Sequence, residues 1–247
     1  MGTSGSFGGS KTWSEVVATA GDQGSGSGSN WAPSSEFVKS LGRALGRGDR
    51  RGSTYTVASL LSGSGGGGGS SGSGDGRRGG ATPPFTRDAA RGALVFAAIE
   101  AIEAADSAAL SELGVDLSSL SGLSGRALFL RLMDMILGGP SHPEDRALRQ
   151  AVLATLRSSP DGQPLGAKIA AFVAALAWER TSVQLASASE RGAIGASRNG
   201  DKIKRWIGAK VNRVADVLSG STPGALANFA VDVAAKACAL FSKGGQP

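Results

Sequence analysis

Apolar residues between positions 83 and 243 recur at steps of three and four, which is the period of one face of an α-helix. Leu148, Val152 and Leu156 form one such stripe. Aromatic residues make up only 5% of the chain, so the core has to be built from Ala, Leu, Val and Ile, which helices accept better than sheets do. The pattern predicts an all-α fold, an irregular bundle of about five to seven helices over residues 83–243.

Start and stop signals divide this region into separate helices. Residues 141–144 read Ser-His-Pro-Glu, the form of a capping box with proline in the first turn. Thr222 followed by Pro223 marks the start of the last helix, and Ser124 is placed to cap another. The run Gly-Gly-Pro at 138–140 ends the helix that Ser124 begins.

Two short helices are predicted ahead of this bundle, in residues 34–61. In the first of them Phe37, Leu41 and Leu45 fall on one face, and such a stripe can dock on the main body or on another protein. Residues 62–82 follow as a flexible linker, which contains an unbroken run of five glycines.

Residues 1–33 are rich in Gly and Ser and are predicted to form a disordered tail, because they supply little apolar area to offset the entropy cost of ordering. Trp13 and Trp31 are isolated aromatics in this tail. Each is interpreted either as an anchor, for a partner or for the chain's own body, or as an exposed residue without a role. Removal of Met1 would leave the amine of Gly2 at the end of the arm.

Charge is distributed unevenly along the chain. The net charge of +6 divides into +3 for residues 1–83, −3 for 84–190 and +6 for 191–247. A basic amphipathic helix is predicted over 201–218. It can pack into the bundle with its charges outward, or it can bind nucleic acid together with two linker arginines. The residues of this alternative site are Arg77, Arg78, Lys202, Lys204, Arg205, Lys210 and Arg213.

Few residues are available for catalysis or metal binding. With one His and one Cys, neither a His/Cys metal site nor a Cys–His nucleophile pair is expected. The glycine-rich linker lacks the lysine of a phosphate-binding P-loop. Glu179 and Arg180 could serve chemistry, but an ion pair or a contact at the edge of the bundle is their usual role. We therefore predict no catalytic residues, no metal and no cofactor, and expect a protein that is not an enzyme.

The location is predicted from what the chain lacks. No run of 18 apolar residues and no secretory signal are found, so neither a membrane span nor export is expected. Cys238, at an apolar helical position, is interpreted as a reduced core residue of a cytoplasmic protein.

The order of these features resembles the QatB-like proteins, the B component of the Qat anti-phage defence systems. The likeness lies in Met-Gly-Thr-Ser-Gly-Ser-Phe-Gly-Gly at 1–9 and in Leu-Gly-Arg-Ala-Leu at 41–45, ahead of the glycine run. It continues in Leu-Gly-Gly-Pro at 137–140 and Ala-Trp-Glu-Arg at 177–180. The Arg/Gly stretch is shorter and less basic here than in that family.

The resemblance implies a bacterial, non-enzymatic accessory protein, encoded beside an ATPase, a QueC-like enzyme and a TatD-like nuclease. The QueC-like enzyme is the implied partner; such enzymes activate a carboxyl-bearing deazapurine with ATP and transfer it to an amine. Gly2 is the expected acceptor, because an α-amine has a low pKa among protein amines and glycine has no side chain to hinder approach. The residues expected to contact the partner are Thr3, Ser4, Phe7, Trp13, Trp31, Phe37, Leu41 and Leu45. The opening Met-Gly-x-x-x-Ser also fits an N-myristoylation signal, which would need a eukaryotic transferase.

Overall fold

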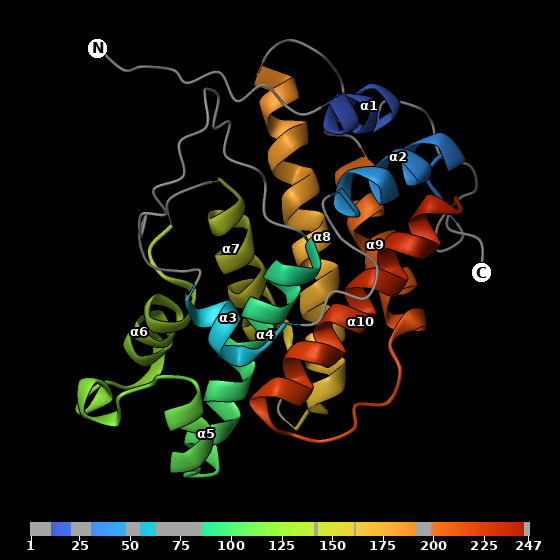
Figure 1. Ribbon diagram of the computed structural model, residues 1–247. Coiled ribbons are helices and arrows are strands. Elements are labelled where there is room, and N and C mark those ends of the chain that lie inside the picture. The colour runs from blue at the N-terminus through green and yellow to red at the C-terminus, as the bar shows by residue number, and fades with distance from the viewer. Residues whose placement is uncertain are drawn as a thin grey trace, which may run out of the picture.

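The computed structural model describes residues 11–20, 31–47, 55–62, 85–140, 143–160, 162–190 and 199–244. Within these ranges the chain forms ten α-helices and one short 3-10 helix (Figure 1). The helices are α1 (Lys11–Ala20), α2 (Ser35–Leu45), α3 (Val57–Leu61), α4 (Phe85–Glu103), α5 (Ser107–Glu112), η3 (Leu117–Leu120), α6 (Gly125–Leu137), α7 (Pro143–Ser158), α8 (Leu165–Glu190), α9 (Gly200–Val214) and α10 (Pro223–Ser242). The all-α class is confirmed, and the seven α-helices described between residues 83 and 243 fall within the predicted number.

Three long helices, α4, α8 and α10, form the centre of the bundle. α4 is buried at 14 of its 19 positions, which explains why its sequence is rich in Ala and apolar on all sides. α10 packs along α4 and also contacts α2, α8 and α9, while α7 lies against α8. At the centre the rings of Phe96 in α4 and Phe172 in α8 lie 5.4 Å apart in a tilted arrangement.

A glycine allows α4 and α8 to approach closely. A Cβ atom built on Gly92 would lie 2.0 Å from Cζ of Phe172, far inside contact distance. The missing side chain therefore makes the space that the Phe172 ring occupies.

The helix starts show which sequence signals act as expected. The hydroxyl of Thr222 accepts a hydrogen bond from the Ala225 amide, with Pro223 in the first turn, as predicted. Ser124 does occupy the N-cap of α6, but its side chain makes no capping hydrogen bond, so that part of the prediction is wrong. The chain instead enters α6 through Gly125 at φ +52°, in the left-handed region that favours glycine.

The basic helix is shorter than the predicted range 201–218, because α9 ends at Val214. Ala215 has extended backbone angles and the chain runs without regular structure to α10. Leu218 still packs against the core, whereas Val217 is 90% exposed. The apolar spacing of these two residues thus extended the predicted stripe past the true end of the helix.

The prediction of a disordered tail over residues 1–33 is wrong for residues 11–20, which form α1. Trp13, Val16, Val17 and Ala20 are spaced at three, one and three positions, which gives the helix one apolar face. Val16 is fully buried, and Trp13 and Ala20 are 8% and 3% exposed. Burial of this face against α2 and α8 provides the free energy that a ten-residue helix lacks on its own.

The first helices and the main bundle share one core. α2 lies on α10, and α3 contacts α4 and α10. Gly42 permits the close crossing of α2 and α10, since a Cβ there would lie 2.3 Å from the backbone nitrogen of Ser242. The segments predicted separately as residues 34–61 and 83–243 therefore pack together as a single body.

Among the described helices, α10 is long and apolar enough to cross a membrane by length and composition alone. Ten of its residues are buried by other helices, including Phe229, Val233 and Phe241. Cys238 is also buried there, as predicted. This arrangement is that of a central helix in a bundle.

Candidate functional site

Trp13 anchors the N-terminal helix to the body of the molecule. It lies beside Pro143 and Ala147 of α7 and Arg180 and Val183 of α8, around a cavity of about 10 Å³. A cavity of that size holds about one water molecule. The sequence left open whether Trp13 anchors the chain to a partner or to its own body. In the structure Trp13 packs on the chain's own body.

Polar contacts fix α1 against α2. The hydroxyls of Thr19 and Ser40 are 3.1 Å apart, and Ser40 is itself buried. Glu15 and Arg43 form an ion pair of 3.2 Å at the exposed edge. An exposed pair of this kind contributes little free energy, so the apolar face supplies most of the attachment and the pair sets its register.

Trp31 connects the N-terminal region to the basic helix. Its ring is half-buried and packs against the core, and Nζ of Lys202 lies 5.6 Å from the ring centroid. On the same helix Lys210 lies 5.8 Å from the centroid of Trp206. Two of the candidate nucleic-acid residues are therefore held against aromatic faces by cation–π contacts.

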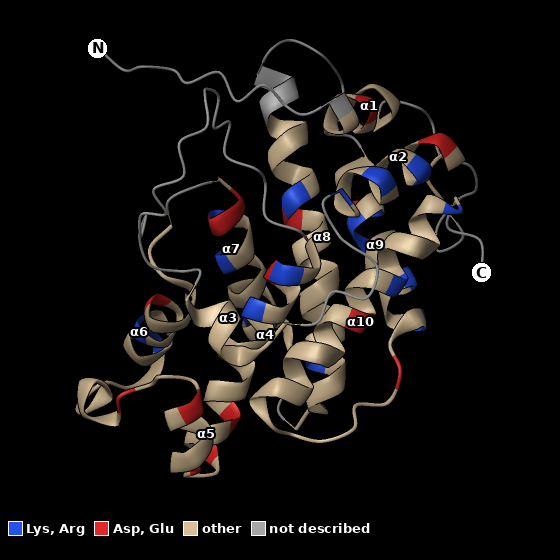
Figure 2. Ribbon diagram, viewed as in Figure 1, with Lys and Arg blue, Asp and Glu red and all other residues tan. Residues whose placement is uncertain are grey.

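The remaining basic residues of α9 are directed outward. Lys204, Arg205 and Arg213 are exposed, while Ile203, Trp206, Ile207 and Val211 turn into the core. Figure 2 shows further Lys and Arg positions on α2, near α9, and Asp and Glu positions around α5 at the other end of the molecule. In the described part of the protein, basic residues therefore gather on the side formed by α2 and α9, and acidic residues gather around α5.

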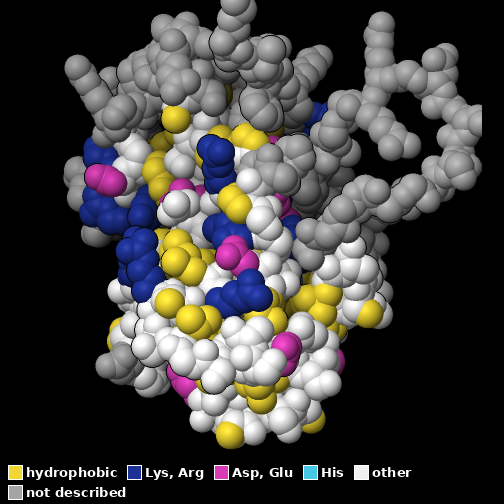
Figure 3. All heavy atoms as spheres, turned by 90° about the vertical axis from the view of Figure 1, so that its left-hand side faces the viewer, with side chains coloured by type: hydrophobic (Ala, Val, Ile, Leu, Met, Phe, Trp, Pro, Cys, Tyr) yellow, Lys and Arg dark blue, Asp and Glu magenta, His cyan; other side chains and the backbone are white. Residues whose placement is uncertain are grey.

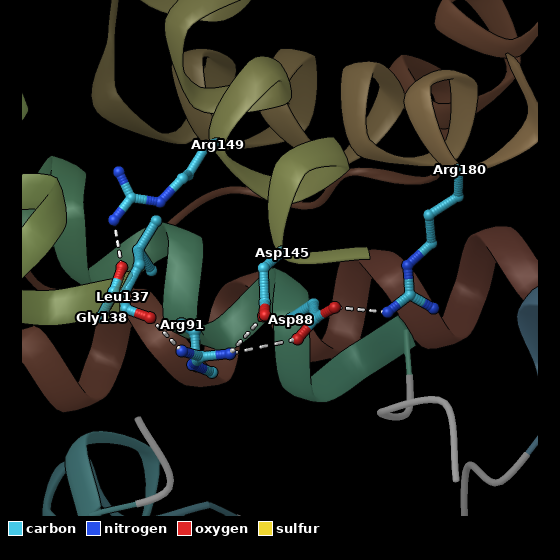
Figure 4. A network of polar contacts seen from close by, with 7 residues as sticks. All are labelled: Asp88, Arg91, Leu137, Gly138, Asp145, Arg149 and Arg180. Carbon is cyan, nitrogen blue, oxygen red and sulfur yellow. Dashed lines mark hydrogen bonds and ion pairs between the residues drawn. The ribbon is translucent and has the colours of Figure 1, made fainter. Parts of the chain in front are cut away.

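A buried ionic network lies beneath the α1 anchor, between α4, α7 and α8 (Figure 4). Arg180 of α8 donates to the carboxylate of Asp88 in α4, and both side chains are buried. Arg91, one turn along α4, lies 3.7 Å from Asp88 and 3.8 Å from Asp145 of α7. Arg91 also donates a 2.6 Å hydrogen bond to the carbonyl of Leu137 at the end of α6. The network thus ties four helices together.

Burial and charge act in opposite directions on the Asp88 carboxyl. Loss of solvent raises its pKa, and the nearby carboxylate of Asp145 adds to this, while the guanidinium groups of Arg180 and Arg91 lower it. Arg180 also lies over the ring of Phe85, with its Cζ 5.7 Å from the centroid. The neighbouring residue Glu179 is only partly buried. This burial raises the pKa of its carboxyl, and the charge of Lys204 in α9 partly offsets the rise. The prediction of an ion pair at 179–180 is confirmed for Arg180.

Of the predicted partner-binding residues, four belong to the core: Trp13, described above, and the three residues of the α2 stripe. Phe37, Leu41 and Leu45 are 1%, 0% and 0% exposed, so their stripe docks on the chain's own body and not on another protein. This corrects their predicted role as partner contacts. The physical reason is that the apolar face of α2 is removed from water by packing on α10. Gly2, Thr3, Ser4 and Phe7 lie outside the described residues, as do Arg77 and Arg78.

Sequence reasoning missed the residues that form the network. Asp88 and Arg180 are 92 positions apart, and no motif connects them. The sequence did hold one signal: Asp88 and Arg91 are charged residues one turn apart, followed by the apolar run of residues 92–99, and a charge buried in such a helix needs a partner. Among the described residues no group of three or more His, Cys, Asp or Glu side chains is placed to hold a metal ion.

Comparison of the chain with protein-family models, with curated proteins and with solved structures finds no match.

Proposed function

We propose that this protein is a non-enzymatic component of a bacterial anti-phage defence system and presents its N-terminal segment to a QueC-like partner enzyme. The proposal rests on the sequence resemblance to QatB-like proteins. The observation that best supports it is the anchored position of α1, which begins at Lys11 and is fastened through Trp13. After removal of Met1, nine residues (2–10) thus precede the anchored helix, far fewer than the long arm that the sequence suggested.

A nine-residue segment is long enough for this task. Fully extended it spans at most about 32 Å. That length reaches into the active site of an enzyme docked against the α1 side of the molecule. The amine of Gly2 would attack the activated carboxyl carbon of the deazapurine, displace the activating group and form an amide.

The test is intact-mass measurement of the protein co-expressed with the QueC-like enzyme, followed by peptide mapping. We expect an added mass confined to the peptide that contains Gly2. The matched control is Gly2→Leu, because a large second residue prevents removal of Met1 and leaves no glycine amine. An unmodified N-terminus in the presence of an active partner and its substrates would overturn the proposal.

Binding to nucleic acid is a second candidate function, favoured by the outward basic residues of α9. Lys204, Arg205 and Arg213 are exposed beside the basic positions of α2 (Figure 2). If these residues contact phosphates, affinity for double-stranded DNA falls steeply with salt, and each lost contact lowers the slope of log K against log salt by about 1. Fluorescence anisotropy with the protein and with Lys204→Glu/Arg205→Glu tests this. No binding at low salt would remove the candidate.

A further inference from the structure

The part of the chain that leads into α6 carries more exposed apolar surface than the rest of the described molecule. We call residues 117–131, from η3 through the first two turns of α6, the α6 tip. Of the four large hydrophobic residues that are exposed in the described ranges, three belong to it: Leu117 at 50%, Leu123 at 37% and Leu130 at 37%. The fourth, Val217, lies between α9 and α10.

The α6 tip is apolar on more sides than its own fold requires. The second half of α6 buries Leu132, Met133, Ile136 and Leu137 against the body. In the first half Leu128 and Phe129 are half-buried and Leu130 is exposed. Three consecutive positions point in three directions around a helix, so the body does not cover all three side chains. Leu130 therefore lies on the exposed face of the helix, one turn after Arg126.

The position of the α6 tip suits contact with another molecule. Figure 1 shows α6 at the edge of the molecule, away from α9 and α10. Figure 3 looks onto this side and shows hydrophobic side chains lying between Lys and Arg side chains. The start of α6 also has no side-chain hydrogen bond from its cap, so a contact there would complete the support of this end of the helix.

The charges on the α6 tip indicate what would cover it. Arg126 and Arg131 are exposed, and neither forms an ion pair with any other described residue. A second copy would bring its own exposed Glu112 and Asp116 together with its two arginines, so it offers no net negative charge to Arg126 and Arg131. An anionic lipid surface would present a continuous layer of negative charge to Glu112 and Asp116 as well. A protein surface can place discrete carboxylates opposite Arg126 and Arg131 and away from Glu112 and Asp116.

We propose that the α6 tip is a docking surface for a partner protein whose contact area is apolar and edged by Asp and Glu side chains. The apolar residues of the tip enter the partner's apolar area, and Arg126 and Arg131 pair with its carboxylates. The proposal is independent of the chemistry at Gly2, because it concerns residues 117–131 in the middle of the sequence and needs no modification.

The test is site-specific photocross-linking in the native host with the full-length chain. A photoreactive phenylalanine analogue replaces Leu130 in one sample and Val217, a more exposed control position outside the α6 tip, in another. We expect a protein adduct at Leu130 at least about tenfold above the Val217 level. Sequencing of the cross-linked peptide is expected to show apolar residues with Asp or Glu beside them. Circular dichroism of the purified samples checks that each variant keeps its helices.

Charge variants make the test specific. Arg126→Glu/Arg131→Glu is expected to reduce the Leu130 adduct at least about tenfold, because two attractive pairs become repulsive. Arg126→Lys/Arg131→Lys keeps the charges and is expected to retain the adduct. Four results would each overturn the proposal: no adduct above the Val217 level, an adduct with a second copy, an adduct with lipid, or an adduct unaffected by charge reversal.

Discussion

At the scale of the residue, Gly92 shows how one missing side chain sets the distance between two helices. Helix propensity alone would favour Ala there by about 1 kcal/mol. The Phe172 ring occupies the place of the Cβ, so packing opposes propensity at this position.

Gly92→Ala is therefore expected to lower the free energy of unfolding by about 1–3 kcal/mol, as overpacked core substitutions do. The matched control is Gly208→Ala in α9, where a Cβ meets nothing within 4 Å and the substitution is expected to stabilise by about 0.5–1 kcal/mol. Urea denaturation of the two variants measures both effects. Equal effects of the same sign would contradict the packing explanation.

The Asp88 carboxylate lies between two buried guanidinium groups, those of Arg180 and Arg91, and Arg91 alone also faces Asp145. Asp88→Asn keeps the shape and removes the charge, so Arg180 stays buried without its counter-charge. We expect a loss of about 3–5 kcal/mol in the free energy of unfolding at pH 7. Asp134→Asn, at the half-exposed pair with Arg149, is the control and is expected to cost less than about 1 kcal/mol. A small effect at Asp88 would show that the pair is dispensable.

Glu179 gives a prediction about pH. Because burial raises its pKa above the ordinary 4.5, the folded protein holds the proton more tightly than the unfolded chain does. Stability from this group is thus full below pH 4.5 and is lost as pH rises above it. Glu179→Gln should match the parent protein near pH 4 and exceed it at pH 7 by less than about 1 kcal/mol, since solvent screens a half-exposed group. Thermal melts across this range measure the difference, and a gain confined to low pH would contradict the sign.

At the scale of the element, the contrast between α1 and α2 shows what sequence pattern can and cannot predict. The stripe of Phe37, Leu41 and Leu45 identified α2, whose N-cap is Ser34. The pattern could not say what the stripe covers, because α10 lies far along the chain. α1 was missed because its ten residues are flanked by Gly and Ser, although Trp13 and Val16 already had helical spacing. Short helices take their stability from packing, and packing is what one sequence does not display.

Trp13→Ala is expected to detach α1 while leaving the central helices intact. The substitution removes the side chain that joins α1 to α7 and α8, and a buried Trp contributes about 3–5 kcal/mol. Hydrogen exchange should become fast for the amides of residues 11–20 and stay slow in α4 and α10. Ser14→Ala, at the exposed neighbouring position, should leave the exchange unchanged. Protection of α1 in both variants would mean that Trp13 is not its anchor.

At the scale of the whole molecule, periodicity and low aromatic content predicted the fold class. They did not predict that the first helices and the main bundle share one core. Nothing in the glycine-rich residues 62–82 indicates that the helices before them pack on the helices after them. The same reason hid the buried network, whose members Asp88, Asp145 and Arg180 come from three helices. Contacts between distant segments depend on how helices are arranged, and helical period alone does not contain that information.

A chain shortened to residues 83–247 is accordingly expected not to fold cooperatively. Without α2 the apolar faces of α10 that cover Phe37, Leu41 and Leu45 are exposed to water. Thermal unfolding followed by circular dichroism should lose its sharp transition, and a separate peptide of residues 31–62 should restore it in part. A cooperative melt of the shortened chain would show that the bundle is self-sufficient.

The pairing of α2 with α10 also has a consequence during synthesis. Roughly 180 residues separate the end of α2 from the start of α10. At about 5–20 residues per second, the ribosome needs about 10–40 s to deliver the second partner after the first has emerged. During that time the apolar face of α2 is not covered by α10. Holdase chaperones at the exit tunnel can bind this face before α10 has been made. A polypeptide released before α10 has been made would leave that side of α2 uncovered.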